Sequence, residues 1–255
     1  MQNDISSSKT FHPLLDVHTH TIVSGHAFST ISEMVAQAQK IGLQILGITE
    51  HAPHLPGTCS YIYFRNYHVV PRQWGNLRLL LGAEFNILDT EGHLDEDEGY
   101  YKCLDLRIAG IHSLCWQGGT REENTRGMIA AIKNPWIHII SHPGDGVAEL
   151  DFEPIVLAAK EANTLLEINN STLEPCRGKL AKAIPNNLEI LRLCKKYDVP
   201  VILGSDAHIF FDIANYRNLF PLLEQTEFPS SLIVNTQPEY FLDFINTKNA
   251  IINNQ

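Results

Sequence analysis

Short runs of apolar residues recur along the chain, and most are followed by a polar loop and then by a segment whose apolar positions have helical spacing. The runs are rich in Ile, Leu and Val, as strands that are buried on both faces usually are. The pattern predicts strands at residues 14–18, 44–49, 77–83, 106–112, 137–141, 165–169 and 199–204.

The segments between and after these strands predict helices. Thr30 and Glu33 have the spacing of a capping box at the start of the first helix, and Pro135 follows the end of the second. The predicted helices span residues 32–41, 122–133, 153–162, 187–196, 216–225 and 238–246.

Strands that alternate with crossover helices predict a parallel sheet, which right-handed crossovers allow to be open or closed into a barrel. A length of 255 residues suits a single barrel, and no linker or low-complexity stretch interrupts the pattern. We therefore predict one α/β domain over residues 13–250 after an N-terminal tail, residues 1–12. The longest irregular piece, residues 51–71, is predicted to be a loop over the site that the strand ends form.

The composition, with 44% hydrophobic and 19% charged residues, is that of a folded protein. A formal net charge of -10 and the absence of a basic stripe disfavour binding to a nucleic-acid backbone. The five cysteines form no CxxC pair, so neither a disulfide framework nor a thiolate zinc site is indicated. The N-terminus lacks the features of a signal peptide, and we predict a soluble, cytoplasmic protein without a membrane segment.

Seven of the twelve histidines lie at the ends of predicted strands. Because the carboxyl ends of the strands meet on one face of a β/α barrel, we expect these histidines to converge there with two carboxylates. The histidines are His18, His20, His26, His51, His112, His142 and His208, and the carboxylates are Glu84 and Asp206.

Imidazoles and carboxylates without a cysteine suit zinc, manganese or iron, and one carboxylate can bridge two ions. His18 and His20 are separated by one residue, so on a strand both side chains point to the same side, as a shared ion requires. Asp16 lies on the same face and is a candidate for orienting the ligands. The acidic run at residues 95–98 is predicted to be a solvated loop. Surface or core positions are predicted for the other histidines, His12, His54, His68, His93 and His138.

The motifs DVHTH, SGH, TEHAPHLPG, GAEFNI, IHS, SHPG, LEINNS and GSDAH together resemble the PHP family, named for its polymerase and histidinol phosphatase members. The likeness covers nearly the entire chain, and within the family it is closest to the YcdX-like phosphatase group. The resemblance implies a distorted (β/α)7 barrel that holds up to three divalent metal ions. Two features depart from the family pattern: Glu50 stands in TEH where the family usually has TDH, and the loop at residues 58–63 differs.

The resemblance also implies which residues hold each ion. The first ion would take His18, His20, Glu84 and Asp206. The second would take Glu84, His112 and His142, so that Glu84 bridges the two. The third would take His26, His51 and His208.

A phosphatase of this family is expected to hydrolyse a small phosphorylated substrate, a phosphomonoester, with a metal-bound hydroxide as the nucleophile. Glu84, His142 and Asp206 are then the predicted catalytic set, and no protein nucleophile is required. Arg72 and Arg177 are candidates for binding the phosphate through their planar guanidinium groups.

Three alternatives stay open at this point. One is a phosphodiesterase or nuclease-like PHP hydrolase, which the acidic charge disfavours. Another is a noncatalytic regulatory protein in which metals only stabilise the fold. The third is an amidohydrolase-like enzyme, which would typically need a bridging lysine where this chain has Glu84. The physiological substrate, the native metal and any homo-oligomer are also left open.

Overall fold

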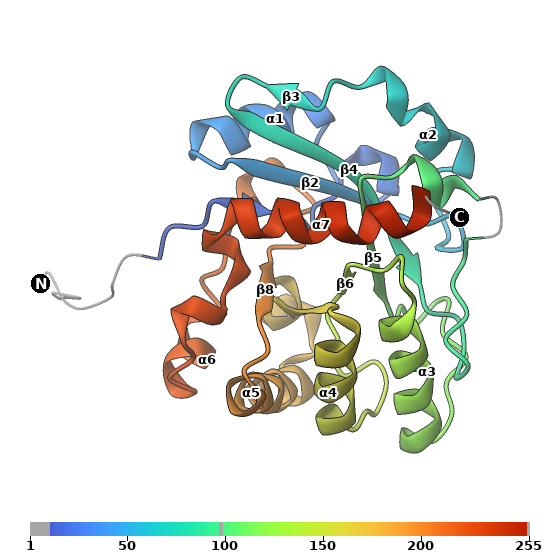
Figure 1. The fold of residues 1–255 in the computed structure, drawn as a ribbon, viewed down its shortest axis with the longest axis vertical. Coiled ribbons are helices and arrows are strands. Elements are labelled where there is room, and N and C mark those ends of the chain that lie inside the picture. The colour runs from blue at the N-terminus through green and yellow to red at the C-terminus, as the bar shows by residue number, and fades with distance from the viewer. Residues whose placement is uncertain (1–10, 97–98, 254–255) are drawn as a thin grey trace, which may run out of the picture.

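The structure is a computed structural model, and it describes residues 11–96 and 99–253. The predicted tail, residues 1–12, lies almost wholly outside the described residues. The sheet at its centre has seven parallel strands in the order β1-β2-β4-β5-β6-β7-β8, and β3 pairs antiparallel with the start of β4 (Figure 1). The strands are β1 (Leu15–Asp16), β2 (Ile45–His51), β3 (Gln73–Trp74), β4 (Leu77–Asn86), β5 (Leu106–Gly110), β6 (Ile139–Ile140), β7 (Leu165–Asn169) and β8 (Val201–Gly204).

The two end strands, β1 and β8, come together and nearly close the sheet into a barrel. Thr19 and Ala207 form a parallel bridge just beyond them. The fully buried amide of Asn235 donates hydrogen bonds to the carbonyls of Leu15 and Leu203 and accepts one from the N–H of Leu203. One side chain therefore joins the two strands at the seam. The predicted barrel of seven parallel strands is confirmed.

Helices surround the barrel (Figure 1). The predicted capping box is present, since Thr30 accepts the N–H of Glu33 and the Glu33 carboxylate accepts the N–H of Thr30. Between β4 and β5 the described chain contains only a 3-10 helix, Tyr100–Cys103, which distorts the regular alternation. The helices are α1 (Ile31–Lys40), α2 (Tyr61–Arg65), α3 (Arg121–Lys133), α4 (Phe152–Ala162), α5 (Leu180–Tyr197), α6 (Phe220–Gln225) and α7 (Pro238–Asn253).

The inside of the barrel is apolar at the amino ends of its strands. Side chains such as Leu15 and Ile45, which begin β1 and β2, pack there with Phe241, Phe244 and Ile245 of α7. α7 thus crosses the barrel and closes this mouth (Figure 1). A larger apolar layer packs α1 to α6 against the outside of the strands. Only the carboxyl ends of the strands remain for a polar site.

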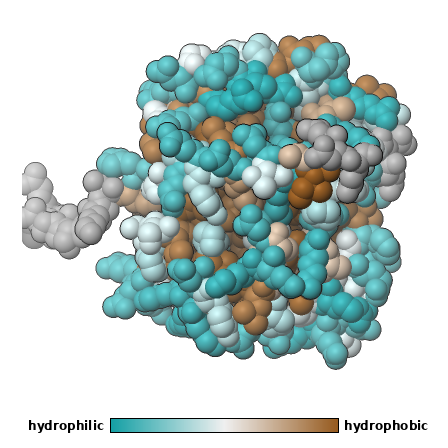
Figure 2. All heavy atoms as spheres, in the orientation of Figure 1, coloured by the Kyte–Doolittle hydropathy of each residue, from teal (hydrophilic) through white to brown (hydrophobic). Residues whose placement is uncertain are grey.

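Hydrophilic side chains cover most of the face that carries α7, and hydrophobic ones form small, separate patches on it (Figure 2). Such scattered apolar residues are normal on a protein surface. Among the described helices, none has both the length and the apolar character that crossing a membrane demands.

Three element predictions are corrected. The segment at residues 51–71 is not wholly irregular, because it contains α2 and then a 3-10 helix, Asn66–Val69. Tyr61 and Phe64 of α2 and Tyr67 of the 3-10 helix recur every third residue and pack against the core. The helix predicted at 216–225 starts only at Phe220, and Pro221 fixes its first turn. The helix predicted at 187–196 begins earlier, at Leu180; Pro185 lies in its second turn and removes only one internal hydrogen bond.

Candidate metal centre

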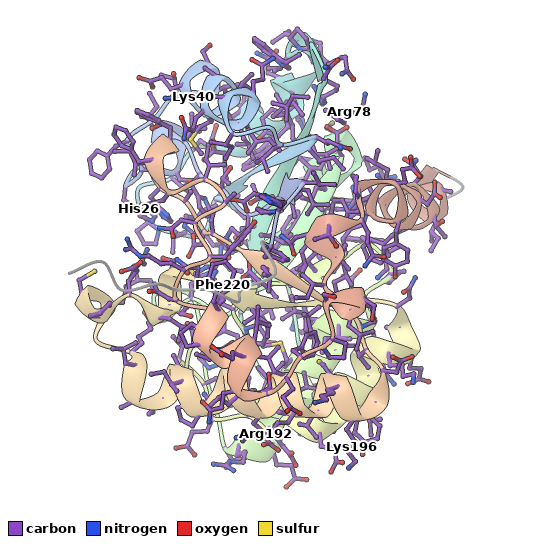
Figure 3. The ribbon with its side chains drawn as sticks, turned by 90° about the vertical axis from the view of Figure 1, so that its left-hand side faces the viewer. His26, Lys40, Arg78, Arg192, Lys196 and Phe220 are labelled. Carbon is purple, nitrogen blue, oxygen red and sulfur yellow. The ribbon has the colours of Figure 1, made fainter. Side chains whose placement is uncertain are left out.

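All nine predicted ligands converge at the carboxyl ends of the strands. Their exposure increases across the cluster, from His20, which is fully buried, to His26, which is exposed to solvent. Figure 3 shows His26 on the side of the molecule opposite α7. The cluster therefore lies deep in the barrel at one end and opens to solvent at the other.

Glu84, at the centre of the cluster, is fully buried. Its Oε1 lies 2.9 Å from Nε2 of His142, 3.3 Å from Nε2 of His112 and 3.4 Å from Nε2 of His18. Its Oε2 lies 2.9 Å from Nδ1 of His51. One carboxylate thus contacts imidazoles from four different parts of the sheet, as a bridging ligand would.

Asp206 is the second carboxylate of the cluster. Its Oδ1 lies 3.3 Å from Nε2 of His20, 3.6 Å from Nε2 of His18 and 3.4 Å from Nδ1 of His208. Asp206 has a backbone φ of 53° and His142 a φ of 34°, conformations that residues other than glycine rarely adopt. Strain of this kind is concentrated at functional sites, where surrounding structure holds a side chain in a required direction.

The exposed end of the cluster consists of imidazoles. Nε2 of His26 lies 3.0 Å from Nε2 of His208, and the ring of His51 stacks on the ring of His26 with 5.0 Å between centroids. Three groups of candidate ligand atoms each fit within 4.8 Å. They are His18, His20 and Asp206; His20, His51 and His208; and His51, Glu84 and His112.

Several buried polar atoms inside the cluster have no hydrogen-bond partner, which normally costs about 1–3 kcal/mol for each. Many of the separations between ligand nitrogens and oxygens are 3.3 to 3.6 Å. Two ligands of one tetrahedral ion at about 2.1 Å are themselves about 3.4 Å apart. The residues therefore fit divalent cations. The unpartnered atoms include Nε2 of His18, His20 and His112, Nδ1 of His51, and Oε2 of Glu84.

Five imidazoles make a hydrogen bond through the ring nitrogen that faces away from the cluster, and this bond orients the lone pair on the other nitrogen. In each, Nδ1–H donates outward, so that the lone pair on Nε2 faces the cluster. The pairs are His18 with Glu167, His20 with Ser24, His26 with the carbonyl of Ser24, His112 with Asn86, and His208 with the carbonyl of Asp206. Lone pairs that face one another at 3.0 Å, as in His26 and His208, favour a shared cation.

A model of the PHP domain matches residues 16–175, and a PHP-associated model matches residues 185–232. The chain belongs to the PHP family. A probable phosphatase of Caldicellulosiruptor bescii is 46% identical over 231 residues, which are 91% of this chain and 95% of that protein. A probable phosphatase of Clostridium novyi is 42% identical over 238 residues, 93% of this chain and 96% of that protein. The predicted PHP membership is confirmed.

A solved structure shares the fold of this chain. It is the histidinol phosphate phosphatase of Lactococcus lactis subsp. lactis, described as complexed with zinc, L-histidinol and phosphate. The superposition has a TM-score of 0.58 with 19% identity and covers 85% of this chain and 95% of that one. At this identity the likeness establishes the barrel architecture.

Glu167 in β7 contacts two of the predicted ligands and was missed by the ligand predictions. Its buried carboxylate accepts the Nδ1–H of His18 at 2.6 Å and the backbone N–H of His142 at 2.8 Å. Gly204 on the neighbouring strand makes room for it, since a Cβ there would meet the Glu167 carboxylate at 1.7 Å. A carboxylate inside an apolar strand, in LEINNS, was the available signal.

Two further hydrogen-bond relays orient predicted ligands from outside the cluster. Asn86 binds His112, and the Asp95 carboxylate in turn accepts hydrogen bonds from the Asn86 side chain and backbone N–H. Asp95 is buried, so the prediction of a solvated loop at 95–98 is wrong for this residue; residues 97–98 lie outside the described chain. Glu50 accepts the hydroxyl hydrogen of Ser24, which accepts from His20. The longer carboxylate in TEH therefore still connects to a ligand.

Asp16, the predicted orienting residue, fixes the loop that carries Asp206. It accepts hydrogen bonds from the Ser205 hydroxyl and from the backbone N–H groups of Ser205 and Ala214. Burial raises the pKa of Asp16 to about 6 despite these hydrogen bonds. Its partners are backbone and hydroxyl groups rather than the imidazoles themselves.

The electrostatics of the cluster keep its carboxylates ionised and several imidazoles neutral, whereas neighbouring carboxylates outweigh burial and raise the pKa of His18 and His142. Burial raises the pKa of Glu84, but the surrounding imidazoles, His18 foremost, outweigh it and hold that pKa well below its usual range. The same balance holds the pKa of Asp206 well below its usual range. Burial and neighbouring imidazoles lower the pKa of His20, and burial lowers the pKa of His51 to about 4. Carboxylate and neutral imidazole are the forms that bind metal.

The two predicted phosphate-binding arginines have different surroundings. Arg177 lines the cavity over the cluster, and no hydrogen bond or ion pair engages its guanidinium within the described part of the chain. Arg72 is not brought to the site. It donates to Asp105 at 2.5 Å and to the carbonyls of Tyr67 and Val70, near the amino ends of β4 and β5. These contacts contradict the predicted role of Arg72, whose guanidinium already has structural partners.

Proposed function

We propose that this PHP protein is a metal-dependent phosphatase that hydrolyses phosphomonoesters at a site with three divalent ions. One observation carries the proposal: five imidazoles donate outward from Nδ1, and their Nε2 lone pairs converge around two ionised carboxylates. Imidazoles and carboxylates oriented in this way suit divalent cations. Two relatives of 46% and 42% identity that carry the name probable phosphatase support the reaction class.

The ligand sets implied by the resemblance agree with the distances for two ions. The first ion is supported by the short distances among His18, His20 and Asp206, with Glu84 beside them. The second ion is supported by the contacts of Glu84 with His112 and His142. For the third ion, His26 and His208 support the assignment, whereas His51 also lies beside Glu84 and His20. Zinc is the first metal to test, since the structure of the histidinol phosphate phosphatase contains it, and manganese and iron follow.

When bound, paired divalent ions act as Lewis acids that activate water and neutralise phosphoryl oxygens. Glu84 keeps its negative charge at neutral pH, and it would bridge the first two ions. His142 contacts Glu84 from one side of the cluster, and Asp206, which also stays ionised, lies on the other side. Arg177 faces the cavity with its guanidinium unengaged among the described residues, and its planar fork suits two phosphoryl oxygens.

The test compares hydrolysis of p-nitrophenyl phosphate and bis(p-nitrophenyl) phosphate by zinc-loaded protein, with a chelator-treated sample beside it. We expect chelator-sensitive cleavage that favours the monoester. His142→Ala should remove most of the activity without unfolding the chain, and the exposed His68→Ala serves as the matched control. Faster cleavage of the diester would support the nuclease-like alternative, and bound metal without any turnover would support a noncatalytic protein.

A further inference from the structure

One buried serine contacts three of the predicted ligands. Ser24 is fully buried at the end of the 3-10 helix Ile22–Ser24, between β1 and α1. Its hydroxyl oxygen lies 3.1 Å from Nδ1 of His20 and accepts the backbone N–H of His51 at 3.1 Å. Its backbone carbonyl accepts the Nδ1–H of His26 at 3.0 Å. Ser24 therefore joins the imidazoles that follow β1 to the imidazole that ends β2.

The hydrogen-bonding roles of the Ser24 hydroxyl are fixed by Glu50. The hydroxyl donates its one hydrogen to Oε2 of Glu50 at 2.6 Å. Both oxygens of this buried carboxylate receive hydrogens, since Thr21 donates its backbone N–H to one and its hydroxyl hydrogen to the other. A hydroxyl whose hydrogen is engaged can only accept from its other partners. Nδ1 of His20 must therefore carry the hydrogen, which leaves the Nε2 lone pair for the cluster.

The loop after β2 holds the same turn from the other side. A Cβ on Gly25 would meet the carbonyl oxygen of Gly57 at 2.1 Å, so the two backbones are in direct contact. Gly25 has a φ of 81°, which favours glycine. In the same loop, the hydroxyl of Thr58 donates to the carbonyl of His51 at 2.8 Å. The turn that carries Ser24 and the end of β2 are thus held in one arrangement.

The ligands that contact Ser24 lie toward the exposed end of the cluster. Short distances group His20 with His51 and His208, whereas the family resemblance groups His26 with His51 and His208 for the third ion. We call the ion that either set would hold the outer ion. In both sets, two of the three imidazoles contact Ser24. The first ion has one such ligand, His20, and the second ion has none.

We propose that Ser24 is a positioning residue for the outer ion, because its hydroxyl sets the tautomer of His20 and fixes the backbone of His51. The inference rests on the three-ion site of the proposed function, and it adds the residue that controls one of the ions. Ser24 does not line the cavity over the cluster. Its loss should therefore weaken metal binding without removing a contact to the substrate.

The test uses Ser24→Ala, with Ser29→Ala as the matched control. Ser29 is also fully buried and lies in the same segment, but its hydroxyl accepts the backbone N–H of Phe210 rather than a hydrogen from an imidazole. Competition with a chromophoric chelator gives the zinc affinities. In Ser24→Ala, one of three ions should bind about 10- to 100-fold more weakly, and the other two should change by less than about threefold. Ser29→Ala should match the wild type.

Gly25→Ala provides a second variant that keeps the hydroxyl. Its Cβ displaces the turn from Gly57, so the same ion should be weakened. Wild-type affinities for all three ions in both Ser24→Ala and Gly25→Ala would overturn the inference. An equal loss in Ser29→Ala would also overturn it, because the effect would then belong to the segment and not to the Ser24 hydroxyl.

The tautomer of His20 is a readout that a purely structural effect would not move. Nitrogen-15 NMR of the chelator-treated full-length chain distinguishes Nδ1–H from Nε2–H, and His20→Gln identifies the signal. The wild type should show Nδ1–H. Ser24→Ala should show Nε2–H, because Nδ1 then lacks its acceptor while Nε2 lies 3.3 Å from Oδ1 of Asp206.

The NMR result also separates this inference from the proposed function. An Nε2–H tautomer in the wild type, or an unchanged Nδ1–H tautomer in Ser24→Ala, would overturn the role of Ser24. A wild type that binds three ions but hydrolyses no phosphomonoester would instead refute the proposed reaction. The zinc affinities and the tautomer in Ser24→Ala would still decide whether Ser24 positions the ligands.

Discussion

The two ends of the barrel both bury ionisable side chains, and they differ in whether those side chains have partners. At the carboxyl end, imidazole nitrogens and a Glu84 oxygen face one another without hydrogen bonds. At the amino end, beneath α7, Arg107 donates to the carbonyls of Leu104, Tyr101 and Trp136. Burial alone therefore does not identify a functional site; a converging set of unpartnered ligand atoms does.

The amino-end cluster attaches α7 to the barrel. Lys248 of α7 donates to the carbonyl of Ile137 at 2.6 Å and to the Thr164 hydroxyl at 2.8 Å. His138 is buried and accepts the N–H of Arg107, as the prediction of a surface or core position allowed. Burial lowers the pKa of Lys248 to about 8 and that of Arg107 to about 10. These groups are structural, so changes here should alter stability rather than chemistry.

The largest expected effect comes from Glu84→Gln. The neutral amide cannot bridge cations, so several kcal/mol of transition-state stabilisation are lost and kcat/KM falls at least about 100-fold. Steady-state kinetics with a phosphomonoester measure the change, and Glu153→Gln on the surface of α4 is the control. A Glu84→Gln enzyme with more than about a tenth of normal activity would remove Glu84 from its central role.

Glu167→Gln should have a smaller effect, about 10- to 100-fold on activity or metal affinity, because it weakens the orientation of His18. Gly204→Ala should act in the same direction, since its Cβ displaces the same carboxylate. The two changes should not add when combined, because they disturb one contact. Chelator competition gives the metal affinity, and full additivity would mean that Gly204 acts by another route.

Arg107→Met tests the structural role of the cluster at the amino end of the barrel. It removes the donor from the buried carbonyl of Leu104 and from two part-buried carbonyls. The change should lower the free energy of unfolding by about 2 kcal/mol, while kcat/KM stays within about twofold. Urea denaturation followed by circular dichroism measures the stability. A selective loss of activity with unchanged stability would contradict the division between the two ends.

The smallest expected effect is a pH dependence of the free energy of unfolding, caused by Lys248 in the amino-end cluster. The pKa of Lys248 is about 8 in the folded chain and 10.5 ordinarily, so between these values the unfolded chain binds more protons and stability rises with pH. Relative to Lys248→Met, the wild type should gain about 1 kcal/mol of unfolding free energy between pH 8 and 9. Parallel stability curves for the two proteins would show that Lys248 titrates normally.

The convergence of the nine predicted ligands was predictable because each lies near or beyond the carboxyl end of a strand, and parallel strands end on one face. The residues that orient these predicted ligands, such as Glu167, Asn86 and Asp95, were not predictable in the same way. Asp95 reaches its buried position because the chain after β4 turns back on Asn86, and a run of acidic residues does not encode that turn. Arg72 shows the reverse error, since its motif looked suitable for phosphate while its actual partner, Asp105, is far along the sequence. Such contacts depend on tertiary packing, which local patterns do not contain.

The most direct test of the central claim is elemental analysis of divalent metal in three purified proteins: the wild type, Glu84→Gln and Arg107→Met. We expect about three ions per chain in the wild type and in Arg107→Met, and a clear loss in Glu84→Gln, because the groups that could hold an ion among the described residues all lie in the carboxyl-end cluster. A wild-type protein without bound metal after incubation with zinc, manganese or iron, or equal metal content in Glu84→Gln, would contradict the central claim.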